Sequence, residues 1–115
     1  MIRNFNKTQQ LGNLGRTPVL RKTSNGTPVT DFSLATTSRW LTKDNEERTK
    51  TEWHKVVVWG RLAESVCQIA EKGDLVYVEG KITYREYEKD GIKRQITEIE
   101  GNQVLKMESK RTHDK

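Results

Sequence analysis

Residues 52–60, EWHKVVVWG, place two of the chain's three tryptophans on either side of a run of valines. Valine is β-branched and suits a pleated, half-buried surface, so this stretch predicts a β-strand. Side chains on a strand alternate between two faces, so one face receives Trp53, Lys55, Val57 and Trp59, and the other His54, Val56 and Val58. The second face is apolar enough for a core. The first carries two indoles with a lysine between them, which indicates a binding surface.

The composition indicates one small domain with a lean core. The chain has 115 residues, of which 32% are hydrophobic and 32% are charged, a balance that favours a small sheet with one solvated face. It contains no run of about 18 apolar residues and no apolar signal segment, so we expect a soluble, cytoplasmic protein with no membrane partner. The single Cys67 cannot form an internal disulfide. A formal charge of +5 suits a polyanionic partner.

The spacing of turn residues is that of a β protein. Asn25-Gly26 and Asp90-Gly91 are pairs that accept the positive φ angles of tight hairpins. Around them, extended segments are predicted at 3–15, 18–23, 28–40, 52–60, 74–87 and 93–105. In segment 74–87, alternation predicts one core-like face with Val76, Val78, Ile82 and Tyr84, and one basic, aromatic face with Tyr77, Lys81, Thr83, Arg85 and Tyr87.

One helix is predicted between the strands. In residues 61–72 an apolar stripe is formed by Leu62, Val66, Ile69 and Ala70, and Gly73 follows as a stop. If 18–23 continues the first strand, the order is three strands, the helix and two strands. That order predicts an all-β protein with one helix: an OB-fold, a five-stranded Greek-key barrel with the helix between strands 3 and 4. The domain is expected over 1–105. The polar segment 41–51 is expected to be a mobile loop, and 106–115 a short, basic, flexible C-terminal tail.

Catalytic and metal-binding patterns are missing from the sequence. The chain has two histidines, His54 and His113, and one cysteine, with no closely spaced His, Cys and carboxylate set. The GNLG at 12–15 lacks the third glycine of a dinucleotide fingerprint, so a bend or bulge in a barrel strand is the better interpretation. We therefore expect no enzyme activity, no cofactor and no metal.

Aromatic residues interleaved with basic ones indicate nucleic-acid binding. Exposed rings stack on unpaired bases, while neighbouring lysines and arginines follow the phosphates. The candidate rings are Trp40, Trp53, Trp59 and Tyr87. Core packing is the alternative for each tryptophan, and a structural role beside a hairpin is the alternative for Tyr87. His54, on the valine face, is expected to be buried or at a subunit contact.

Four segments, at 11–21, 25–40, 51–64 and 72–87, closely resemble the bacterial single-stranded DNA-binding protein (SSB) family, in register from about residue 11 to 100. The resemblance implies an OB-fold protomer that assembles as a homotetramer, with a dimer left open. It implies sequence-independent binding and protection of single-stranded DNA in replication, recombination and repair, in association with the nucleoid.

The resemblance also implies roles for individual residues. Trp40, Trp53 and Tyr87 match the family's base-stacking tryptophans, and Trp59 matches a stacking phenylalanine. Arg21, Arg61, Lys72 and Arg85 match basic positions along the DNA path, and Arg39, Lys43, Lys55 and Lys81 are further candidates for phosphate contacts beside the rings. His54 and Tyr77 match positions at subunit contacts.

The sequence departs from the family in three places. Thr8, Gln9 and Gln10 stand where the family is apolar, and Glu86 stands at a usually basic position. The chain ends in the basic KMESKRTHDK rather than in an acidic tip, so recruitment of replication proteins through an acidic tail is not expected. The alternatives are an RNA-binding or primosomal OB-fold protein, a DNA-free structural or adaptor subunit, and a nuclease.

Overall fold

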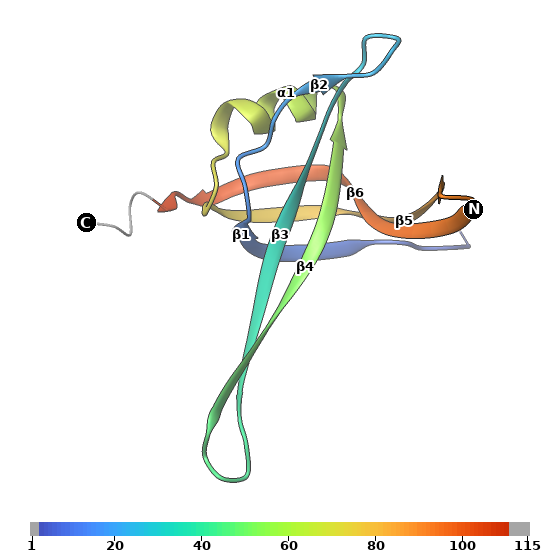
Figure 1. Cartoon of the computed structure of the whole chain (residues 1–115). Helices are drawn as coiled ribbons and strands as arrows, with labels where there is room; N and C mark the ends of the chain where they lie inside the picture. Colours follow the sequence, from blue (N-terminus) through green and yellow to red (C-terminus); the bar gives the residue numbers. More distant parts are fainter. Residues whose placement is uncertain (1–2, 111–115) are drawn as a thin grey trace.

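The computed structural model describes residues 3–110, which form a barrel of long strands closed at one end by a helix (Figure 1). The elements in chain order are β1 (Thr8–Leu14), β2 (Arg21–Lys22), β3 (Pro28–Leu41), β4 (Glu47–Trp59), α1 (Gly60–Ile69), β5 (Leu75–Lys89) and β6 (Ile92–Glu108). The strand order is β1-β5-β6-β4-β3-β2, and β1 also pairs with β3, which closes a five-stranded barrel with β2 as an added edge. The predicted all-β barrel, with its helix between the third and fourth barrel strands, is confirmed.

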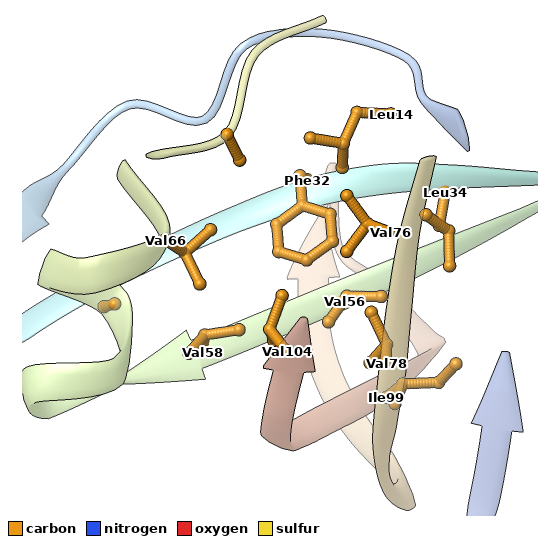
Figure 2. Close-up of a cluster of buried hydrophobic side chains, with 12 residues drawn as sticks. Leu14, Phe32, Leu34, Val56, Val58, Val66, Val76, Val78, Ile99 and Val104 are labelled. Carbon is orange, nitrogen blue, oxygen red and sulfur yellow. The ribbon is translucent and has the colours of Figure 1, made fainter. Parts of the chain in front are cut away.

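The core lies inside the barrel and under α1. Val56 and Val58 of β4 are completely buried, as the alternation of 52–60 predicts, and they meet Phe32 of β3 (Figure 2). Val76 and Val78 of β5 close the other side of the cluster. Each fully buried side chain of this size contributes about 1.5–3 kcal/mol, so this small cluster supplies much of the driving force for folding.

The closure of the barrel depends on a close approach between β1 and β3. A Cβ on Gly12 would lie 2.1 Å from the carbonyl oxygen of Ala35, so only a residue without a side chain lets the two backbones meet. Asn13 and Leu14 then pair with Ala35 and Leu34. The glycine predicted to mark a bend therefore marks the seam of the barrel. The irregularities in pairing lie between β5 and β6, at Leu75/Val76 and at Glu79/Gly80.

The helix differs in detail from its prediction. It spans 60–69 rather than 61–72, and its buried residues are Ala63 and Val66. Ile69, predicted in the apolar stripe, is 49% exposed, so that assignment is wrong. The helix ends one residue before Ala70, which is buried in extended backbone rather than in a last helical turn.

The predicted mobile loop at 41–51 is wrong, because β3 and β4 continue as a paired ribbon as far as Leu41 and Glu47. A five-residue turn closes it, with Asn45 at φ 61° and the Thr42 hydroxyl accepting a hydrogen bond from the Glu46 amide at 3.1 Å. Figure 1 shows this ribbon projecting well away from the barrel. Both of its faces are solvated, so its strands carry no apolar alternation from which a strand could be predicted.

Other boundaries also shift. The first strand begins at Thr8 rather than at residue 3, and 18–23 does not continue it, because β2 pairs with Pro28 and Val29 of β3. Tyr84, predicted on the core face, is 65% exposed, because the β5–β6 pair extends past the barrel. That hairpin ends in the predicted Asp90-Gly91 turn, with both residues at positive φ.

The C-terminal prediction is corrected as well. Strand β6 runs through Glu108, with Lys106 paired to Val76, so residues 106–108 are strand rather than a flexible tail. Residues 109 and 110 follow the strand, and the last part of the predicted tail, 111–115, lies outside the described residues.

A buried carboxylate fixes this end of the barrel. Asp74 is 1% exposed and accepts hydrogen bonds from the backbone amides of Glu71 at 2.9 Å and Lys110 at 3.1 Å. The Lys106 ammonium lies 3.2 Å from the same carboxylate. Burial raises the pKa of Asp74, but these hydrogen bonds and the nearby lysine outweigh burial and hold the pKa below its ordinary value. Asp74 thus joins the end of α1, the start of β5 and the end of β6.

We expect Asp74→Asn to lower the free energy of unfolding by about 1–3 kcal/mol at pH 7, because the amide leaves a buried partner unsatisfied. The lowered pKa gives wild type a stabilising contribution that is complete above about pH 4 and is lost as the pH falls through the folded-state pKa. Urea unfolding should therefore show the difference from wild type shrinking in acid.

The control is Asp44→Asn in the exposed β3–β4 turn, which should match wild type at both pH values. An Asp74→Asn deficit of the same size at pH 3 and pH 7 would contradict the role given to the charge.

Candidate nucleic-acid interface

The outer face of β4 is wet, as its alternation predicts. Trp53 is 61% exposed and Trp59 47%, with Lys55 between them on the same face. The other two predicted rings are also exposed, Trp40 at 47% and Tyr87 at 40%. None of the four belongs to the core, so the alternative of core packing does not hold for the tryptophans.

Trp59 stands at one wall of a cleft of about 700 Å³ that crosses the outer face of the barrel. Strands β2 to β6 all contribute to it. The predicted basic residues Arg21, Lys55 and Arg85 line this cleft. Three carboxylates that were not among the predicted site residues line it as well: Asp31, Glu98 and Glu100. Tyr87 lies on the same face of β5 as Arg85, two residues along the strand.

Glu98 occupies the floor of the cleft and is only 7% exposed. Arg85 donates to its two carboxylate oxygens, from Nε at 3.3 Å and from Nη2 at 3.0 Å. The Lys55 ammonium lies 3.1 Å from the same carboxylate. The hydrogen bonds from Arg85 lower the pKa of Glu98. Burial opposes this shift, and Lys55 adds to it. The same hydrogen bonds raise the pKa of Arg85. Glu98 and Arg85 are therefore both ionised near neutral pH.

Asp31 links the remaining cations of the cleft. Its carboxylate oxygens lie 3.3 Å from Arg21, 3.4 Å from Arg16 and 3.9 Å from Lys55. Four cations from several strands and a loop thus share the two carboxylates Asp31 and Glu98. The three cations and the three carboxylates that line the cleft balance in formal charge, and the cations are held in a network rather than standing free.

Trp53 lies beyond the cleft, against the end of β1. A Cβ on Gly15 would come within 2.7 Å of its ring, so the indole packs directly over this glycine. The Gly15 amide donates to the Ser33 carbonyl at 2.9 Å, which fixes the backbone beneath the ring. Trp53 and Lys55 also border a smaller hollow of about 320 Å³ that is lined by Gln10, His54 and Ile82.

Several predicted residues lie away from the cleft. Trp40 pairs with Arg48, five residues along the ribbon from the Ala35–Trp53 pair, which is roughly 17 Å. By alternation it lies on the opposite face of the ribbon from Trp53. Four of the remaining predicted cations are spread over the surface: Lys43 in the β3–β4 turn, Arg39 beside Glu47 at 3.8 Å, Arg61 in the first turn of α1 and Lys72 after α1. Lys81 lies next to the cleft, 3.8 Å from Glu100, which lines it.

The two predicted subunit-contact residues lie in different places. His54 is half-buried, with Nε2 2.8 Å from the Thr36 hydroxyl. Tyr77 lies on the outward face of β5, the same face as Arg85 but nearer the start of the strand, and its hydroxyl donates to Glu79 at 2.8 Å and accepts from Gln9 at 2.8 Å. The contact role of both remains a prediction.

The carboxylates of the cleft could have been found from sequence. Asp31 precedes the buried Phe32, and Glu98 and Glu100 flank the buried Ile99, so alternation places all three on the solvated face. Alternation does not show that Glu98 pairs with Arg85 and Lys55, because these two cations lie on other strands. Arg16, on the loop after β1, carries no such pattern.

Within residues 3–110, no helix is long and apolar enough to cross a membrane. In the same range, no group of three or more His, Cys, Asp and Glu side chains could hold a metal ion.

A small barrel with exposed rings and cations on its outer face is an OB-fold of the kind that binds oligonucleotides. Residues 5–107 match the model of the Single-strand binding protein family, and the chain belongs to this family.

Individual relatives agree with this assignment. The chain is 43% identical to Single-stranded DNA-binding protein 1 of Xylella fastidiosa, over 96% of this chain and 83% of the relative. It is 41% identical to the Single-stranded DNA-binding protein of Neisseria meningitidis serogroup A, over 87% of this chain and 58% of the relative. The chain thus spans little more than half the length of the Neisseria protein.

Two solved structures share the fold. One is a Plasmodium falciparum SSB in complex with ssDNA, with a TM-score of 0.82, 30% identity, and coverage of 94% of this chain and 99% of the other. The second is a deletion mutant of the single-stranded DNA binding protein from Thermus aquaticus, with a TM-score of 0.81, 32% identity, and coverage of 96% and 54% respectively.

Proposed function

We propose that this chain binds single-stranded DNA without sequence preference and protects it during replication, recombination and repair. The observation that carries the proposal is the outer face of β4, where Trp53 and Trp59 are exposed on either side of Lys55. The relatives named for DNA binding, and the Plasmodium complex with ssDNA, support it. The chain acts by binding and carries out no catalytic step.

The geometry suits single strands. Base faces are hidden in a duplex and free in a single strand, and each base stacked on an exposed ring contributes about 1–3 kcal/mol. Trp59 and Tyr87 flank the cleft, and Trp53 lies next to it. The exposed cations of the cleft and the chain's net charge of +5 attract the phosphates, so affinity should fall as salt rises.

We also propose that the chain assembles with itself, as a homotetramer. Tyr77 pairs across the sheet with Leu11 on one side and Leu105 on the other, and these leucines are 53% and 46% exposed. Such a contiguous row of partly apolar side chains suits a contact between protomers. His54 would contribute a separate contact. The DNA-binding domain in this proposal extends through the end of β6.

Two rivals share the barrel. An RNA-binding OB-fold protein would use the same rings, and an adaptor subunit would use them to contact a protein. The carboxylates Asp31 and Glu98 favour the adaptor, because they reduce the positive charge of the cleft. The exposed rings on the same face favour a nucleic acid.

Titration with oligo-dT should quench tryptophan emission, because bases stack on the indoles. Trp53→Ala and Trp59→Ala should each weaken binding by about 5-fold to 150-fold, the equivalent of 1–3 kcal/mol. Phe5→Ala is the matched control, because Phe5 is 84% exposed and outside the cleft. Duplex DNA and RNA should compete poorly at equal salt. Unchanged emission at saturating oligo-dT would rule out the stacking face.

The position of Trp40 predicts a dependence on strand length. A strand of about 6 nucleotides falls near the lower end of the site size of one OB-fold, whereas about 20 nucleotides exceeds it and can reach the ribbon. Trp40→Ala should therefore leave the affinity for the short strand unchanged and weaken that for the long one. Trp53→Ala should weaken both. An equal loss for both lengths with Trp40→Ala would place Trp40 beside the cleft residues instead.

A further inference from the structure

A buried acid in a surface that attracts polyanions needs a reason. Glu98 is 7% exposed and ionised, and it sits on the floor of the cleft proposed for DNA. A negative charge there lowers the attraction for phosphates. Glu98 therefore weakens DNA binding unless it improves the arrangement of the cations around it.

The sheet order shows what Glu98 does for them. Strand β6 lies between β5 and β4, so Glu98 stands between Arg85 on one side and Lys55 on the other. Arg85 is held by two hydrogen bonds at 3.3 and 3.0 Å, and Lys55 by one contact at 3.1 Å. Paired donation by a planar guanidinium fixes its orientation as well as its position.

Free lysine and arginine side chains are long and flexible, and holding them in one place reduces their rotamer freedom. A carboxylate that already holds both side chains removes most of that loss from the binding step. Arg85 remains 54% exposed and Lys55 35% exposed, so both can still meet a phosphate.

We propose that Glu98 is a positioning residue for DNA binding, which holds Arg85 and Lys55 in the arrangement that receives the phosphate backbone. This inference rests on the proposed function. A positioning role and a purely electrostatic role predict opposite changes in DNA affinity when the charge of Glu98 is removed. If Glu98 were only a negative charge in the cleft, its removal would tighten binding. A positioning role requires that its removal weakens binding.

The test compares Glu98→Gln with Glu100→Gln, by oligo-dT titration over a series of salt concentrations. Glu100 lines the same cleft, but its side chain is 45% exposed and its ion pair with Lys81 is 3.8 Å long. Both variants remove one negative charge. Glu100→Gln should bind more tightly than wild type. Glu98→Gln should bind about 5-fold to 10-fold more weakly, with a salt slope shallower by about 0.7, the value of one phosphate contact to a single strand.

Arg85→Lys provides a second arm that keeps both the charge and Glu98. Lysine cannot make the paired hydrogen bonds, so this variant should also weaken binding, and adding Glu98→Gln to it should cause little further loss. Thermal unfolding of each variant checks that it folds. If Glu98→Gln does not fold, Arg85→Lys decides alone.

Two outcomes would overturn the inference: Glu98→Gln binding as tightly as wild type or tighter, or Arg85→Lys binding like wild type. A wild-type chain that does not bind oligo-dT would instead overturn the proposed function, so the two failures are distinguishable.

Discussion

The alternation of side chains along β4 is the constraint on which both the barrel and the candidate site depend. Val56 and Val58 point into the core, whereas Trp53, Lys55 and Trp59, at the alternate positions of the strand, point outward. A slip of one residue in the pairing with β3 would exchange the two sets, burying a lysine and exposing the valines. The long ladder between β3 and β4 prevents that slip, so the core and the binding face are fixed by the same register.

The charges of the cleft are organised by ion pairs. Asp31 and Glu98 each hold cations that come from other elements, so the basic residues do not stand as separate flexible side chains. The rings are placed differently. Trp53 rests on Gly15 at the seam of the barrel, while Trp40 is carried out on the ribbon. In the proposed complex, a DNA strand would meet two kinds of contact: a compact cleft on the barrel and a distant, exposed ring on the ribbon.

The parts of this structure that depend on local pattern could be predicted from the sequence. The two faces of 52–60, the Asp90-Gly91 hairpin and the helix between strands all follow from periodicity and turn chemistry. The β3–β4 ribbon could not be predicted, because a strand with two solvated faces has no apolar period. Alternation predicts the face on which Tyr84 lies but not the point where the barrel ends. Helical spacing likewise predicts an apolar stripe that includes Ile69 but not that the helix ends there with this side chain exposed. The partners of Glu98 depend on which strands are neighbours, and that is set by the whole fold.

The central claim is that the outer face of β4 and the cleft beside it receive the DNA strand. Backbone amide and indole NMR shifts of the labelled protein, recorded while unlabelled oligo-dT is added, test it most directly. We predict that the largest changes fall on the indole N–H groups of Trp53 and Trp59 and on the amides of the cleft. Leu11, Tyr77 and Leu105, which form one row across the sheet near the start of β5, should keep their shifts. Changes centred on this row, with both indoles unmoved, would contradict the claim.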